Sequence, residues 1–185
     1  MIITGFRGES EGARVTVTGG FSPGSGQLGV SKAFISRDAA DFLLPGSPSH
    51  EHVEASGRGV LLLADGSRHE GDLFGAATIA EGELVFTTNM TGYQESLTDP
   101  SFAGQVLTFT WPLLGNYGIA PGISESAGVW PRGVVCRELM MEPDHRHCIG
   151  TVHDLLLAHG VPGISGIDTR AVTRRVREYG VILSI

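Results

Sequence analysis

The stretch ELVFTTNMTGYQESLTDPSFAGQVLTFTW, residues 83–111, decides the prediction of the fold. Its two ends, residues 83–88 and 105–111, are rich in β-branched and aromatic residues, which is typical of central strands. Between these ends, residues 90–105 carry hydroxyls, amides and carboxylates but neither cysteine nor histidine. A nucleophilic site needs an activated nucleophile beside a base, so this connection can act only through shape and hydrogen bonding.

The polar connection is predicted to contain two short turns or helices. Thr91 and Gln94 have capping-box spacing, which indicates a short helix that starts at Gly92. Asp99 before Pro100 indicates a second turn or helix start, with proline at the first helical position. The polar groups either only close these turns or present a rigid set of donors and acceptors to a partner or a small polar ligand. Local chemistry leaves both interpretations open.

The rest of the chain predicts further strands followed by helices. Asp65 and Gly66 form a strong hairpin-turn signal, and the strand after this turn, at 67–74, is expected at a sheet edge. Helices are predicted from Thr151 to Gly160 and from Asp168 or Thr169 to Gly180. Strands before helices indicate an α+β fold with a mixed sheet. The other strands are expected at residues 60–64, 132–139, 161–167 and 181–185.

Composition divides the chain near residue 58. Residues 1–58 mix glycine, serine and proline with short apolar islands, which predicts a poorly ordered extension. Residues 59–185 carry the strand and helix patterns and are expected to form the folded domain.

Charge and hydropathy exclude several classes of protein. The net charge of −7 argues against a dedicated nucleic-acid binder, which would carry a basic face. No apolar run approaches the roughly 20 residues of a membrane-spanning helix. The N-terminus lacks a basic segment ahead of an apolar one, so no secretory signal is expected. These patterns predict a cytoplasmic protein that binds neither nucleic acid nor membrane.

The two cysteines do not indicate a catalytic or metal site. Cys136 lies inside an apolar strand, where a thiol is an inert small hydrophobe. Cys148 follows Asp144, His145 and His147, but such tight spacing suits a tetrahedral metal site poorly. We therefore expect no catalytic residue, no bound metal and no cofactor in this chain.

Four segments together resemble a known family. These are LADGSRHEG (63–71), GELVFTTNMTGYQESLTDPSFAGQVLTFTWPLLGNYGI (82–119), RGVVCREL (132–139) and HGVPGISGIDTRAVTRRVREYG (159–180). In order and spacing they resemble the N-terminal domain of the small subunit of glutamine-hydrolysing carbamoyl-phosphate synthetase. The resemblance runs from about Val60 to Val181, and the first 58 residues have no counterpart in it. It implies a three-layer β/β/α fold with a mixed sheet.

The resemblance also implies a role as one part of a larger enzyme. In the family, a glutaminase domain with a Cys nucleophile, a His base and an acidic partner follows this domain, and the complete ligase serves arginine and pyrimidine biosynthesis. The chain stops where the linker to that domain would begin. We therefore expect it to lack the catalytic triad, to need a glutaminase domain in cis or in trans, and to be inactive alone.

Two sets of site residues follow from the resemblance. Ser101 matches the serine that the family associates with glutamine binding, although it could also be only a turn residue. The second set is assigned to docking on the large subunit, with a role in the core or in a turn left open for each member: Asn89, Thr91, Tyr93, Gln94, Glu95, Asn116 and Tyr117.

Two other functions stay open at this stage. One is a free-standing binding module that kept the fold and has a different partner. The other is a small hydrolase that uses Cys136 with a histidine, which would require an environment that stabilises the thiolate.

Overall fold

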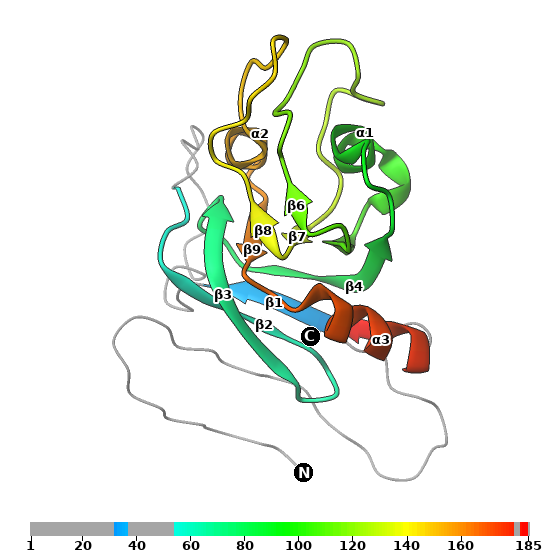
Figure 1. Cartoon of the computed structure of the whole chain (residues 1–185). Helices are drawn as coiled ribbons and strands as arrows, with labels where there is room; N and C mark the ends of the chain where they lie inside the picture. The colour runs from blue at the N-terminus through cyan, green and yellow to red at the C-terminus, as the bar shows by residue number, and fades with distance from the viewer. Residues whose placement is uncertain (1–31, 37–53, 180–181, 185) are drawn as a thin grey trace, which may run out of the picture.

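The computed structural model describes residues 32–36, 54–179 and 182–184, and they form an α+β fold around a mixed sheet (Figure 1). The sheet closes into a barrel in the order β1-β10-β4-β5-β7-β9-β3-β2. The run from β4 through β5 and β7 to β9 is parallel, whereas β2, β3 and β9 pair antiparallel. The strands are β1 (Lys32–Ser36), β2 (Arg58–Leu62), β3 (Arg68–Gly75), β4 (Ala80–Thr87), β5 (Gln105–Phe109), β6 (Leu113–Leu114), β7 (Gly133–Val135), β8 (Glu138–Leu139), β9 (Pro162–Ser165) and β10 (Ile182–Ser184).

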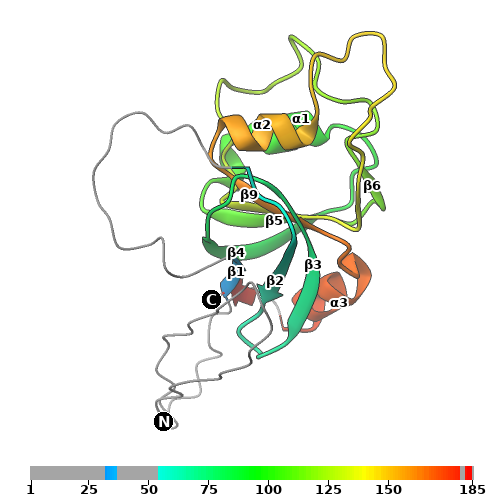
Figure 2. The same cartoon turned by 90° about the vertical axis from the view of Figure 1, so that its left-hand side faces the viewer.

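Helices cover the barrel on two sides. Helix α1 (Tyr93–Thr98) and helix α2 (Val152–Ala158) lie on one side, and α3 (Thr169–Tyr179) lies on the opposite side in both views (Figures 1 and 2). A short 3-10 helix, η2 (Pro100–Phe102), follows α1. The α+β class with a mixed sheet is confirmed, and the curled sheet with its helical cover agrees with the expected three-layer β/β/α arrangement.

Two hydrophobic clusters hold these layers together. The first lies between the barrel and helices α1 and α2, and contains Leu97, Leu107 and Leu156. The second contains Leu61, Val106 and Ile164 from the strands, and Val172 of α3. Alternate residues of β5 enter different clusters, Val106 the second and Leu107 the first. Both faces of this strand are therefore buried, as its nearly continuous apolar sequence requires.

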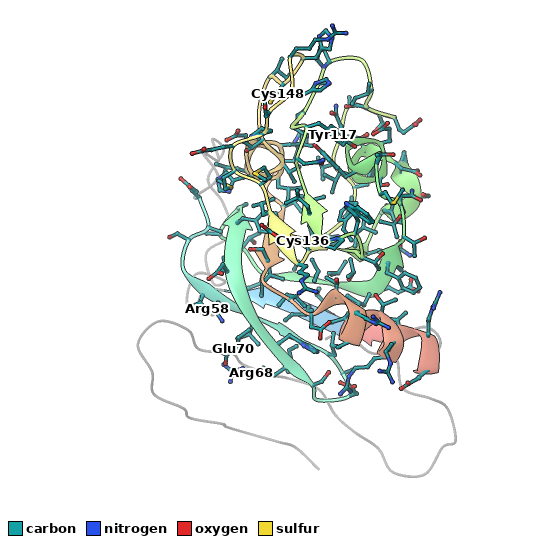
Figure 3. All side chains as sticks on the ribbon, in the orientation of Figure 1. Arg58, Arg68, Glu70, Tyr117, Cys136 and Cys148 are labelled. Carbon is teal, nitrogen blue, oxygen red and sulfur yellow. The ribbon has the colours of Figure 1, made fainter. Side chains whose placement is uncertain are left out.

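The predicted turn between β2 and β3 is confirmed. The prediction that β3 lies at a sheet edge is wrong. Gly66 has a φ of 83°, which favours glycine, and Leu62 pairs with Arg68 across the turn. However, β3 also pairs with β9, because the sheet closes and leaves β3 no free edge. The ion pairs Arg58–Asp72 and Arg68–Glu70 lie on the exposed surface of this hairpin (Figure 3).

Residues 132–139 form two short strands, so the prediction of one strand is wrong. β7 belongs to the barrel, whereas β8 pairs with β6 in a separate sheet of two strands. The partner changes within three residues: the N–H of Cys136 donates to the carbonyl of Ile164, and that of Glu138 donates to the carbonyl of Pro112. The apolar sequence is continuous across this change and cannot reveal it.

The two predicted C-terminal helices are confirmed with their start signals. Thr151 is the N-cap of α2 and forms a full capping box with Asp154. Helix α3 starts at Thr169, where the side chain of Asp168 accepts a hydrogen bond from the N–H of Ala171. None of the helices in the described ranges is long and apolar enough to cross a membrane.

Most of the predicted N-terminal extension, residues 1–58, lies outside the described residues. Within it, Lys32–Ser36 form β1, which pairs with β2, β4 and β10. The strand therefore belongs to the barrel.

Candidate binding surface around helix α1

Helix α1 begins differently from the predicted capping box. Its N-cap is Gly92, which has a φ of 78° and no side-chain cap, so the predicted box between Thr91 and Gln94 is wrong. The N–H of Gly92 donates instead to the hydroxyl of Tyr117 at 2.7 Å. A left-handed backbone favours a residue without a Cβ, which agrees with the glycine at this position.

Two tyrosines join the start of α1 to the segment that follows β6. The rings of Tyr93 and Tyr117 stack with centroids 4.2 Å apart, and the hydroxyl of Tyr93 donates to the carbonyl of Gly118 at 2.7 Å. Tyr93 is only 4% exposed, and burial raises the pKa of both phenols, so both stay protonated at neutral pH. For Tyr93 the structure supports the core role that the sequence left open.

Gln94 binds the backbone of a distant loop. Its amide nitrogen donates to the carbonyl of Ala120 and to the hydroxyl of Ser124, both at 2.8 Å, and its oxygen accepts from the N–H of Ala120 at 2.9 Å. The side chain is 2% exposed. Gln94 therefore also acts inside the fold, where its hydrogen bonds replace those lost to water.

Thr98, one turn after Gln94, binds the same loop. Its hydroxyl accepts from the N–H of Glu125 at 2.9 Å, and its carbonyl accepts from the hydroxyl of Ser126 at 2.7 Å. The N–H of Trp130 donates to the carbonyl of Leu97. Residues 120–130, hereafter the 120–130 loop, have no helix or strand of their own, and these hydrogen bonds join them to α1. Polar residues at i and i+4 of a helix share one face, which was the available signal in the sequence.

The turn at Asp99 agrees with its prediction. Asp99 is the N-cap of η2, Pro100 occupies the first turn, and the Asp99 carboxylate accepts from the N–H of Ser101 at 2.8 Å. Hydrogen bonds from Ser101 lower the pKa of Asp99. Ser101 is exposed, so a ligand can reach its hydroxyl.

An open hollow at the N-terminal end of α1 brings several of the predicted interface residues together. Asn89 and Thr91 are exposed at its rim, and Tyr93 contributes to its wall. Beside them lie two large apolar side chains that were not among the predicted interface residues, Met90 at 63% and Trp111 at 43% exposure. Each lies just beyond the end of a strand; the sequence shows the large apolar residue there but not its exposure. The lining residues are Asn89, Met90, Thr91, Tyr93, Phe109, Trp111, Leu113 and Leu114.

The other predicted interface residues differ in their accessibility. Asn116 is exposed, whereas Tyr117 is partly buried under its ring stack. Glu95 is also partly buried, and its Oε2 is enclosed without a hydrogen-bond partner among the described residues. Asn89, Thr91 and Asn116 can therefore meet a partner directly, while Tyr93 and Gln94 shape the surface from beneath.

The two cysteines lie in different environments. Cys136 lies within the body of the fold and is fully buried, and burial raises the pKa of its thiol (Figure 3). Cys148 lies in the loops near α2, where its thiol donates to the carbonyl of Gly150 at 3.2 Å. In the part of the chain that the structure describes, no group of three His, Cys, Asp or Glu residues could hold a metal ion.

Comparison with known proteins identifies similar chains. Residues 61–185 match the family model described as carbamoyl-phosphate synthase small chain, CPSase domain. The carbamoyl phosphate synthase small chain of Staphylococcus haemolyticus is 46% identical over 125 residues, which are 68% of this chain and 34% of the relative. The protein of the same name from Methanopyrus kandleri is 48% identical over 128 residues, 69% of this chain and 36% of the relative. That of Streptococcus agalactiae serotype III is 50% identical over 123 residues, 66% and 34%. This chain spans about a third of the length of these relatives.

Proposed function

This chain belongs to the carbamoyl-phosphate synthase small-chain family, and from that premise we propose that it docks on the large subunit of the synthase. The docked domain supports delivery of glutamine-derived ammonia for carbamoyl phosphate synthesis, in the cytoplasm, for arginine and pyrimidine biosynthesis. It contributes no catalytic group and no cofactor of its own. A glutaminase domain, in cis or in trans, supplies the ammonia.

The hollow at the N-terminal end of α1 is the observation that carries the docking proposal. Met90 and Trp111 expose large apolar side chains there, and aromatic residues and methionine are enriched at the cores of protein interfaces. Asn89 and Thr91 add polar groups at its rim. A tryptophan beside a hollow is the kind of residue that dominates binding energy at an interface.

The docking test measures binding of this chain to the large synthase subunit of the same organism. We expect saturable binding of the wild type, and a loss of more than about tenfold in affinity for Trp111→Ser, because truncating an interface hot spot costs about 2 kcal/mol or more. The matched control is Met141→Ser, since Met141 is another large exposed apolar residue, at 50% exposure, outside the hollow. Circular dichroism and thermal melting check that each variant is folded.

Two outcomes would contradict docking through the hollow. One is a folded Trp111→Ser chain that binds as tightly as the wild type. The other is a folded wild-type chain that does not bind, which would favour a free-standing binding module with another partner. The hydrolase alternative has no support from Cys136, because a buried thiol with a raised pKa supplies no thiolate.

We further propose that Ser101 contacts glutamine held by the glutaminase domain. Its exposure and the rigid turn of η2 support this role. In the reconstituted synthase, Ser101→Ala is expected to raise the KM for glutamine several-fold, the effect of removing one hydrogen bond to the substrate. Synthesis driven by added ammonia is the internal control and should be unchanged. An unaltered KM for glutamine would assign Ser101 to the turn alone.

A further inference from the structure

One ion pair joins helix α3 to the hairpin between β2 and β3. Arg175 of α3 contacts the carboxylate of Asp65, which lies in the hairpin turn. The other oxygen of this carboxylate accepts a hydrogen bond from the N–H of Ser67 at 2.8 Å. The second ion pair of α3, Arg174–Glu178, stays within the helix. Among the described residues, Asp65–Arg175 is therefore the only ion pair between α3 and another element.

His69 of β3 lies in the contact between the barrel and α3. Gly71 and Leu73 share its face of the strand, because alternate residues of a strand point the same way. Leu73 packs against the cluster that contains Val172 of α3. His69 itself is partly buried, and its Nε2 is enclosed without a hydrogen-bond partner among the described residues. The ring nitrogen is therefore shielded from water while α3 is in place.

The charges that act on His69 come from the hairpin turn and from α3. Burial lowers the pKa of His69 below its usual value of 6.5, and the guanidinium of Arg175 lowers it further. The carboxylates of Asp65 and Asp168 act in the opposite direction but do not outweigh these two effects. Asp168 lies at the start of α3, where its side chain accepts a hydrogen bond from the N–H of Ala171. His69 is therefore neutral at neutral pH, and a proton on its ring is unfavourable.

We propose that His69 makes the attachment of α3 to the barrel sensitive to pH, so that α3 opens more often under mildly acidic conditions. A proton on His69 adds a second cation beside Arg175, in a contact that shields the ring nitrogen from water. Opening of α3 relieves both costs, because it separates the two cations and lets water reach the imidazole. Histidine suits this role, since its charge changes close to neutral pH.

The direction of the effect follows from proton binding. When α3 is open, His69 has its usual pKa of 6.5, so the open state binds more protons than the closed state at pH values between the two pKa values. The free energy of opening therefore falls as the pH falls through 6.5, and it levels off below the lower pKa of the closed state. Asp65 does not titrate in this range, because hydrogen bonds from Ser67 and the charge of Arg175 outweigh its partial burial and hold its pKa below 3.8.

Amide hydrogen exchange of the whole chain measures the opening of α3. The N–H of Val172, which donates to the carbonyl of Asp168, is the main reporter, together with the other amides of the helix. Exchange rates at about pH 5.5 and about pH 7.5, each divided by the intrinsic rate at that pH, give the opening constants. We expect the wild-type constant to be about threefold larger or more at the lower pH, the result of a pKa lowered by about half a unit or more.

Two matched pairs of variants test the mechanism. His69→Gln should remove most of the pH dependence, whereas His159→Gln, which changes an exposed histidine at the end of α2, should retain it. Arg175→Gln should enlarge the opening constant at both pH values, because it removes the ion pair with Asp65. It should also reduce the ratio between them, because it removes the cation beside His69. Arg174→Gln makes the same charge change at a side chain that is 74% exposed, and should change neither quantity by more than about twofold.

Proton NMR of His69 Cε1–H in the wild type checks the titration without any variant. A midpoint at or above 6.5, the usual value, would overturn the proposal. So would equal wild-type opening constants at the two pH values, or a folded His69→Gln chain that keeps the wild-type ratio. These measurements do not involve the large subunit, and α3 lies on the opposite side of the barrel from α1 (Figures 1 and 2). A failure of the docking proposal and a failure of this one therefore give different results.

Discussion

At Gly71 the fold leaves no space for a side chain. A Cβ at this position would lie 2.1 Å from the carbonyl oxygen of Ser165 and 2.8 Å from Cγ1 of Ile164. The carbonyl belongs to the backbone of β9, which pairs with β3, so it cannot move without parting the two strands. We predict that Gly71→Ala lowers the free energy of unfolding by about 3 kcal/mol, as overpacking does in a rigid core. Urea denaturation measures this change.

Gly150 provides the matched control for this residue. The nearest atom to its Cβ position is 3.7 Å away, and its backbone is outside the left-handed region. Gly150→Ala should change the free energy of unfolding by less than about 0.5 kcal/mol, as is usual for surface substitutions. Equal effects of the two substitutions would show that β3 and β9 do not approach as closely as the structure has them.

At the scale of the element, α1 and α2 are short helices that depend on different supports. α1 has six residues, too few to be stable alone, and hydrogen bonds to the 120–130 loop and the Tyr93–Tyr117 stack hold it. α2 has seven residues and a complete capping box. The stability of α2 therefore includes the hydrogen bonds of the capping box, which depend on the protonation state of Asp154.

The capping box of α2 predicts a pH dependence. Hydrogen bonds from Thr151 lower the pKa of Asp154 below its usual value of 3.8. The carboxylate therefore stabilises the fold above the pKa of the unfolded chain, and this contribution is lost as the pH falls through the lower, folded-state pKa. We predict that Asp154→Asn costs about 0.5 kcal/mol near pH 6, and that the difference from wild type shrinks below about pH 4.

Denaturation at the two pH values measures this effect, with Asp144→Asn as the control. Asp144 is an exposed carboxylate in the loop before α2, and its replacement should leave the stability nearly unchanged at both pH values. A cost of Asp154→Asn that is the same at low and neutral pH would mean that the Asp154 charge does not contribute to the cap.

At the scale of the whole molecule, the closed barrel and its two clusters separate the thiols. Cys136 is fully buried in the cluster beneath α1 and α2, whereas Cys148 is only partly buried. We predict that a thiol reagent modifies Cys148 in the native chain, and modifies Cys136 only as fast as the molecule opens, slower by orders of magnitude. The absorbance of the chromophore that the reagent releases follows both the fast reaction of Cys148 and the slow reaction of Cys136.

Cys148→Ser is the control for this labelling, because it should remove the fast phase and leave the slow one. Added urea should accelerate the slow phase, since it populates the open states. A fast reaction of Cys136 in the native chain would contradict its burial and would revive the hydrolase interpretation.

Local chemistry made several elements predictable from the sequence. The Asp65–Gly66 turn, the Asp99–Pro100 start of η2 and the Thr151 cap of α2 each depend on residues that are neighbours in the chain. Long-range pairing was not predictable in the same way. The apolar pattern of residues 67–74 indicates a strand but not its second partner, β9, and that of 132–139 does not show where the chain leaves the barrel.

The binding surface around α1 also combines features that depend on neighbouring residues with features that depend on long-range contacts. The sequence by itself determined that the connection between β4 and β5 is polar, contains neither cysteine nor histidine and starts η2 at Asp99, because turns and caps depend on chemistry within a few residues. Only the tertiary structure decided that Gln94 and Thr98 hold the 120–130 loop, and that Met90 and Trp111 share one hollow. The hydrogen bonds of Gln94 reach residues about 26 positions away. Partners at such separation meet only when the barrel closes, so the pattern along the chain cannot specify them.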